Sequence, residues 1–146
     1  MSAPTVPDAA GTLTYVDTSA IVKLLFAEAE SDALRRWFRD ASPSLVSSAL
    51  LDVEVARTVV RARSQSGEVV PDSAVRAVLD AIDFIDLDAG QLKIASGLAD
   101  SYLRTLDAIH LAAALSIGDR LGTIVTYDVR MMQAARGRSL VVVAPA

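Results

Sequence analysis

The sequence predicts an α/β protein in which a five-stranded parallel sheet lies between two layers of helices, a three-layer α/β/α sandwich. Short runs rich in β-branched residues alternate with longer stretches whose apolar residues recur at helical spacing. Of the 146 residues, 52% are hydrophobic and only 5% are aromatic, which suits helices packed on an aliphatic sheet. No internal repeat or low-complexity linker divides the chain, so we expect one domain with one core.

Five runs of residues are the expected strands, and helical segments separate them. They are Leu13 to Val16, Leu45 to Ser47, Phe84 to Leu87, Thr123 to Thr126 and Leu140 to Val143. Strands that alternate with helices favour parallel pairing, because a parallel connection has to cross back over the sheet. Residues 1–12 contain Pro4, Pro7 and Gly11 and are predicted to be a flexible lead-in, so that residues 13–146 form the domain.

Apolar spacing and turn residues locate the expected helices. Residues 33–38 and 51–62 each carry apolar side chains at intervals that place them on one helical face. Pro71, followed by Asp72, predicts a helix start after a loop near Gly67. Three further glycines are predicted to end helices: Gly118, Gly122 and Gly137.

Composition and charge exclude several classes of function. The chain has no cysteine, which excludes a disulfide framework, thiolate catalysis and thiolate metal sites and leaves oxygen as the expected metal ligand. The N-terminus lacks the features of a signal peptide and no run of about 18 apolar residues occurs, so we expect a cytoplasmic protein without a membrane partner. The net charge of −4 argues against a nucleic-acid binder that relies on phosphate contacts alone. Carboxylates that bind divalent cations would reverse the local field and remove this objection.

Acidic residues directly follow the first and fourth expected strands. Asp17, with the hydroxyl residues Thr18 and Ser19, comes after the first strand, and Asp128 follows the strand that ends at Thr126. Because the carboxyl ends of parallel strands meet at one edge of a sheet, we expect these side chains at a common site. The structural alternative is that these residues only cap helices, since Asp, Thr and Ser side chains commonly accept the free N–H groups at a helix start.

Two more acids lie on expected helices. Glu54 falls about two turns into the helix after the second strand, where a surface ion pair with Arg57 or Arg61 is the structural alternative. Asp107 lies in the first turn of a helix so apolar that it should be buried, where it can instead cap the helix. The single histidine, His110, is interpreted as a hydrogen-bonded core residue.

Convergence of four acids at one end of a sheet points to a divalent cation. Like charges held within a few ångströms repel each other unless one is protonated or a metal is bound. With ligands that are oxygens only, the expected ion is Mg²⁺ or Mn²⁺. The four acids, Asp17, Glu54, Asp107 and Asp128, are the candidate ligands of such an ion.

These motifs resemble those of PIN-domain ribonucleases, in particular the VapC toxins of VapBC toxin–antitoxin pairs. The resemblance rests on the segment 16–20, on Glu54, on the run Leu-Asp-Ala-Ile-His-Leu-Ala-Ala-Ala at 106–114, and on the segment 125–128. It implies a PIN-like fold and a Mg²⁺-dependent endoribonuclease in which Mn²⁺ can substitute. The implied catalytic and metal-binding residues are Asp17, Glu54, Asp107 and Asp128, with Thr18, Ser19 and Thr126 as helpers.

The resemblance also implies partners. They are an RNA substrate, a second copy of the chain in a homodimer, and a cognate VapB-type antitoxin. The helix pair expected between residues 20 and 41 is the candidate docking surface for the antitoxin. Few aromatic residues are available to stack on RNA bases, with Tyr15, Trp37, Tyr102 and Tyr127 as the candidates.

The acid after the first strand is compatible with three other classes of protein. A haloacid-dehalogenase-like phosphatase would use Asp17 as nucleophile but expects a second Asp two residues later, where this chain has Ser19. A response-regulator receiver domain expects a lysine after a late strand, which the segment 126–130 lacks. A catalytically inert PIN-like module that binds RNA or protein is the non-enzyme alternative, and it predicts no stabilisation by divalent ions.

Overall fold

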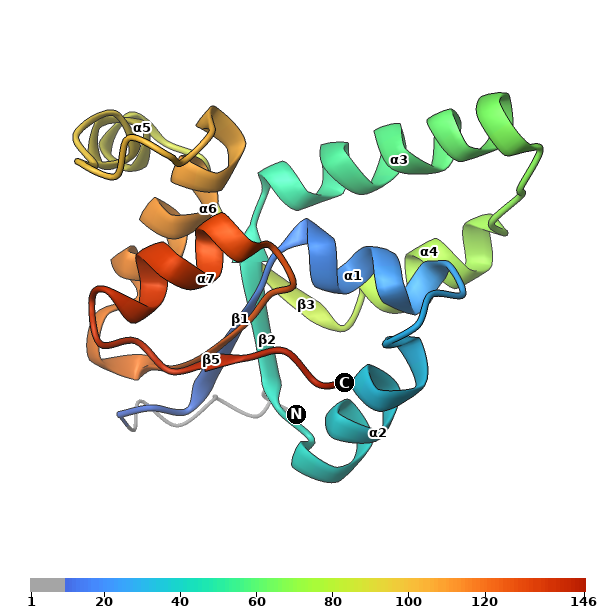
Figure 1. The fold of residues 1–146 in the computed structure, drawn as a ribbon, viewed down its shortest axis with the longest axis horizontal. Helices are drawn as coiled ribbons and strands as arrows, with labels where there is room; N and C mark the ends of the chain where they lie inside the picture. The colour runs from blue at the N-terminus through green and yellow to red at the C-terminus, as the bar shows by residue number, and fades with distance from the viewer. Residues whose placement is uncertain (1–9) are drawn as a thin grey trace, which may run out of the picture.

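The computed structural model describes residues 10–146, and it has a central five-stranded sheet with helices on both faces (Figure 1). The strands are β1 (Leu13–Val16), β2 (Ser44–Ser48), β3 (Ile82–Ile85), β4 (Leu121–Val125) and β5 (Val142–Val143). The helices are α1 (Thr18–Leu25), α2 (Ser31–Ala41), α3 (Leu50–Ser66), α4 (Asp72–Leu79), α5 (Ala89–Ser96), α6 (Thr105–Ser116) and α7 (Val129–Arg136), with a short 3-10 turn, η1 (Gly118–Arg120). The predicted fold class is confirmed. Most of the expected lead-in, residues 1–9, lies outside the described part.

All strand pairs are parallel, in the order β3-β2-β1-β4-β5. Strand β1 is central, with Tyr15 opposite Val46 of β2 on one side and opposite Ile124 of β4 on the other. The chain therefore runs from β1 outward to β2 and β3, then crosses back to β4 on the far side of β1. Ligands of open parallel sheets bind at this kind of switch point, outside the carboxyl ends of the two strands.

Two cores lie on the two faces of the sheet, because successive side chains of a strand point to opposite faces. Tyr15 belongs to the core covered by α6 and α7, together with Leu111 and Ile124. Its neighbour Val16 belongs to the core beneath α1 and α3, together with Leu51. The apolar helix α6 is buried along 110–114, as its composition predicts. Within residues 10–146 no helix is long and apolar enough to span a membrane.

The later strands are displaced from the predicted positions. Strand β3 occupies 82–85 rather than 84–87, because Ile82 is the buried residue that pairs with Leu45, whereas Phe84 is 39% exposed. Strand β4 occupies 121–125 rather than 123–126, and β5 is confined to 142–143 rather than 140–143. Strand β5 pairs with β4 at two positions, Val142 with Ile124 and Val143 with Val125.

Gly122 does not end a helix, so that prediction is wrong. It lies within β4, where a Cβ atom would stand 2.1 Å from the carbonyl oxygen of Gly11. Glycine is required there because the backbone at residue 11 crosses too close for any side chain. Gly118, at φ +66°, follows α6, and Gly137 follows α7, as predicted.

Candidate active site

The Asp17 carboxylate lies at the carboxyl end of β1 and is 5% exposed. Ser19 Oγ donates to Asp17 Oδ1 at 2.6 Å, and Thr126 Oγ1 donates to Oδ2 at 2.5 Å. The backbone N–H of Ala20 also donates to Oδ1, at 3.3 Å, so Asp17 caps α1. The cap alternative is therefore correct, but it accounts for only one of the three bonds, and Thr126 reaches Asp17 from the neighbouring strand.

The surroundings of Asp17 disfavour its charge. Burial raises the pKa of Asp17, while the hydrogen bonds from Ser19 and Thr126 act in the opposite direction. Loss of hydration is the largest of these effects, so the pKa ends above its ordinary value. A cation close to the carboxylate would remove this disadvantage.

Thr126 connects Asp17 to Asp128. Its hydroxyl oxygen accepts the backbone N–H of Asp128 at 3.1 Å while its hydrogen goes to Asp17. The Asp128 side chain caps α7 by accepting the N–H of Met131 at 2.9 Å. The end of β4 is also tied to α1, because the N–H of Tyr127 donates to Ser19 Oγ at 2.9 Å.

Glu54 reaches the same edge of the sheet from α3. Its Oε1 atom accepts Thr18 Oγ1 at 2.7 Å and lies 2.5 Å from Nε2 of His110. Its side chain is 17% exposed. The alternative of a surface pair with Arg57 or Arg61 is wrong, since in the described part of the chain the ionic partner of Glu54 is His110.

Asp107 lies in the first turn of α6, where one carboxylate oxygen accepts the backbone N–H of Arg104 at 3.3 Å. The cap expected of this residue is therefore present. Burial raises the pKa of Asp107, and the negative charge of Asp128 raises it further. The two carboxylates thus lie close enough to repel each other, although they come from helices on different parts of the chain.

The donor chemistry of this edge fits Mg²⁺ or Mn²⁺, since it consists of carboxylate and hydroxyl oxygens. Among residues 10–146, however, no three acidic or histidine side chains stand close enough together to hold a metal ion. Both oxygens of Asp17 are engaged by hydroxyl groups. The fold brings the acids to one region without assembling them into a complete coordination cage.

A shallow hollow opens beside these residues. It has a volume of about 340 Å³, and its lining includes Thr18, Ser19 and Asp128. Lys23 also lines it, with its ammonium group bound to Glu28 at 2.7 Å and to Glu30 at 2.8 Å. The only lysine of the hollow is therefore already neutralised by two carboxylates.

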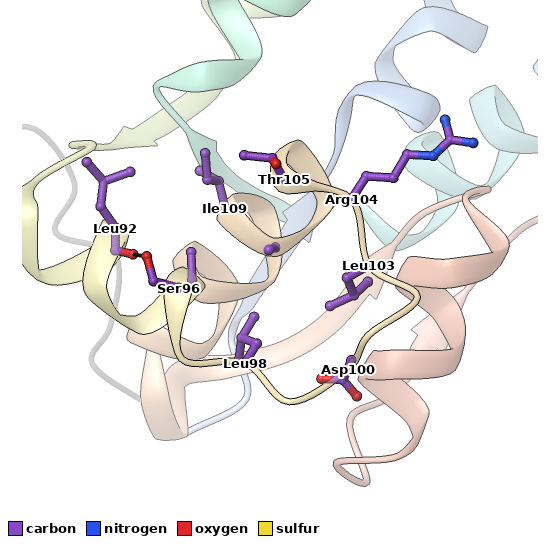
Figure 2. Close-up of a pocket in the computed structure, with 10 residues that line it drawn as sticks. Leu92, Ser96, Leu98, Asp100, Leu103, Arg104, Thr105 and Ile109 are labelled. Carbon is purple, nitrogen blue, oxygen red and sulfur yellow. Dashed lines mark hydrogen bonds between the residues drawn. The ribbon is translucent and has the colours of Figure 1, made fainter.

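A larger pocket of about 520 Å³ lies apart from the acids, between α5 and the beginning of α6 (Figure 2). Its walls are mostly apolar, with Leu92 on α5 and Ile109 on α6. Arg104 is among the lining residues, but its guanidinium group points away from Leu92 (Figure 2). No acid predicted for the site lines this pocket, so it is not the candidate active site.

Two residues near the acids have contacts that sequence analysis did not specify. Tyr15 cannot stack on RNA bases, because its side chain is fully buried and its hydroxyl lies 2.6 Å from His110 Nδ1. His110 is 3% exposed and hydrogen-bonded, as predicted, and it also contacts Glu54. The signal for both was weak: a tyrosine two positions before Asp17 and a histidine three positions after Asp107.

Comparison with known proteins assigns the family. The PIN-domain profile matches residues 14–137. Ribonuclease VapC46 of Mycobacterium tuberculosis is 46% identical over 131 residues, a match that covers 90% of this chain and 96% of that protein. The chain belongs to the PIN-domain family, in its VapC group. Ribonuclease VapC35 of the same species is 43% identical over 134 residues, with the same two coverages.

Two solved PIN-domain toxin structures share the fold. VapC20 of M. tuberculosis, described as a sarcin–ricin loop cleaving toxin, has a TM-score of 0.63 and 17% identity, covering 83% of this chain and 94% of that one. A chain in a toxin–antitoxin complex from Klebsiella pneumoniae has a TM-score of 0.64 and 22% identity, and the match covers 91% of this chain and 98% of that one. The acids of this PIN domain thus lie on a framework shared with distant toxins.

Proposed function

We propose that this PIN domain is a Mg²⁺-dependent endoribonuclease that acts as the toxin of a toxin–antitoxin pair, with Mn²⁺ able to substitute. The observation that carries the proposal is the Asp17 carboxylate, which is buried at the switch point between β1 and β4 and linked through Thr126 to Asp128. Among residues 10–146 no cationic side chain makes a hydrogen bond to this carboxylate, so the site is suited to a bound cation.

Asp17, Asp107 and Asp128 are the proposed ligands. When bound, Mg²⁺ polarises the phosphodiester and lowers the pKa of a water molecule that attacks phosphorus. The hydroxyls of Ser19 and Thr126 hold the Asp17 carboxylate in one orientation. Asp107 and Asp128 supply the neighbouring negative charge that favours a divalent over a monovalent ion.

Glu54 is the proposed ligand or water-orienting residue. Thr18 and His110 both bind its Oε1 atom, and neither of these bonds uses Oε2. One oxygen of the carboxylate is therefore fixed by the protein, and the other can serve an ion or a water molecule. Thr18 thus assists Glu54, whereas Ser19 and Thr126 assist Asp17.

The proposed substrate and partners follow from the relatives. VapC46 and VapC35 are named ribonucleases, which supports RNA as the substrate. Their VapC names support a VapB-type antitoxin, and the proposed docking surface is α2 together with α1, which begins next to Asp17. We further propose a homodimer, and a domain that spans 13–146 after a lead-in of residues 1–12.

The test is RNA cleavage by the purified protein in Mg²⁺ or Mn²⁺, beside EDTA and the variant Asp17→Asn. Asp52→Asn is the matched control, because Asp52 is an exposed acid on α3, two residues from Glu54. We expect cleavage that requires the metal, disappears in Asp17→Asn and persists in Asp52→Asn, with circular dichroism showing that both variants fold. Equal activity of the wild type and Asp17→Asn on several structured RNAs would refute the proposal.

A further inference from the structure

A buried chain of hydrogen bonds connects the centre of the sheet to Glu54. The Tyr15 hydroxyl on β1 lies 2.6 Å from Nδ1 of His110 on α6, and Nε2 of the same ring lies 2.5 Å from Glu54 Oε1 on α3. Tyr15 is fully buried and His110 is 3% exposed. One imidazole ring therefore connects the central strand β1 with α6 on one face of the sheet and α3 on the other.

We propose that Tyr15 and His110 are positioning residues: the tyrosine hydroxyl holds the imidazole ring with Nε2 toward Glu54, and the bond from Nε2 orients this carboxylate. The inference rests on the proposed function, in which Glu54 binds an ion or orients water. It assigns a task to two residues outside the acidic set.

The direction of each bond follows from the donors and acceptors available. An ionised carboxylate only accepts, so the 2.5 Å contact with Glu54 requires a proton on Nε2. A neutral imidazole with a proton on Nε2 has a lone pair on Nδ1, and that lone pair needs a donor. The Tyr15 hydroxyl supplies it, while its oxygen accepts the backbone N–H of Ser48 at 3.2 Å.

The Tyr15 hydroxyl is able to donate, because a tyrosine phenol is protonated near neutral pH. The opposite tautomer would set the Nε2 lone pair against the carboxylate oxygen of Glu54, which is repulsive at this distance.

The tautomer can be measured directly, because His110 is the only histidine of the chain. A long-range ¹H–¹⁵N spectrum of the metal-free wild type is expected to show protonated Nε2 and unprotonated Nδ1. In Tyr15→Phe the donor to Nδ1 is gone, so the Nδ1 shift is expected to move, whereas the contact with Glu54 still favours the proton on Nε2. A wild type protonated on Nδ1, or shifts identical in Tyr15→Phe, would overturn the inference.

A pair of amide substitutions separates positioning from core packing. In His110→Gln the amide nitrogen can occupy the place of Nε2 and still donate to Glu54, whereas in His110→Asn the shorter amide reaches only the place of Nδ1. We expect His110→Asn to lower kcat about 10- to 100-fold with little change in KM, as for other residues that orient a metal ligand. His110→Gln is expected to lose less.

A purely structural histidine would give a different pattern. Activity would then follow thermal stability, and the two variants would lose kcat in proportion to their loss of Tm, which would overturn the inference. The nitrogen spectrum needs neither metal nor RNA, so it decides the tautomer even if no RNA is cleaved. Failure of cleavage alone would count against the proposed function. A proton on Nδ1 of His110 would count against the positioning role of Tyr15 and His110.

Discussion

Replacing Thr126 with valine removes the hydroxyl that joins Asp17 to Asp128 while keeping the shape of the side chain. The side chain is fully buried, and its hydroxyl makes a 2.5 Å bond to Asp17 and a 3.1 Å bond from the Asp128 N–H. A hydrogen bond to a charged group contributes about 1.5–3 kcal/mol, and an orphaned buried N–H costs about 1 kcal/mol or more. We therefore expect Thr126→Val to lower the free energy of unfolding by about 2–4 kcal/mol.

The assay is thermal and urea unfolding of the metal-free protein. For a domain of this size the loss corresponds to a decrease in Tm of roughly 5–15 °C. Thr126→Ser is the matched control, since it keeps the hydroxyl and loses only a methyl group, at a cost of about 1 kcal/mol. A Thr126→Val protein as stable as Thr126→Ser would refute the reasoning.

A double-mutant cycle identifies Asp17 as the partner. In Asp17→Asn the acceptor is uncharged, so the valine substitution is expected to cost less by about 1 kcal/mol or more than it does in the wild type. Equal costs in the two backgrounds would mean that the stabilising bond of Thr126 does not go to the Asp17 carboxylate.

Three further outcomes are expected. Burial raises the pKa of Asp17 and of Asp107 above the ordinary 3.8, so what these two carboxyl groups contribute to the stability of the metal-free protein should be fully present below that pH. The protein should lose this contribution as pH rises through the raised folded pKa values; urea titrations from about pH 4 to about pH 7 should show a decline that is smaller in Asp17→Asn, and an equal decline would contradict this sign. Gly122→Ala should destabilise by about 1–3 kcal/mol because its Cβ would meet Gly11 O, whereas Gly137→Ala, with its nearest contact at 3.4 Å, should melt almost normally; equal Tm values would contradict the close approach. Mn²⁺ at about ten times its Kd should stabilise the wild type by about 1.4 kcal/mol. In Asp17→Asn that gain should be largely lost, and an unchanged gain would exclude Asp17 as a ligand.

The local pattern of the chain was sufficient to predict the fold class and the placement of two acids. Asp17 and Asp128 each follow a short β-branched run, and the carboxyl ends of parallel strands meet at one edge. The structure places β1 and β4 side by side, so both acids lie at the same part of this edge. These features depend on side-chain periodicity and chain order, both of which are visible in sequence.

Features that depend on contacts between distant residues could not be predicted in this way. The sequence around Gly122 does not reveal why a glycine is needed there. The reason is the close approach of the backbone at Gly11, which is 111 positions away. The partner of Glu54 is His110, 56 positions along the chain, rather than an arginine one turn away. Tyr15 contacts His110 across 95 positions, so its burial and its hydrogen bond leave no local signal.

The most direct test of the metal site is anomalous diffraction from crystals of the wild type and of Asp17→Asn soaked in Mn²⁺. We expect a peak at the carboxyl ends of β1 and β4 in the wild type, with a ligand distance of about 2.0–2.3 Å to an Asp17 oxygen and with Asp107 or Asp128 turned toward the ion. The peak should be absent from Asp17→Asn. A wild-type crystal with no Mn²⁺ at this edge, or with Mn²⁺ bound only elsewhere, would contradict the claim that these acids form the metal site.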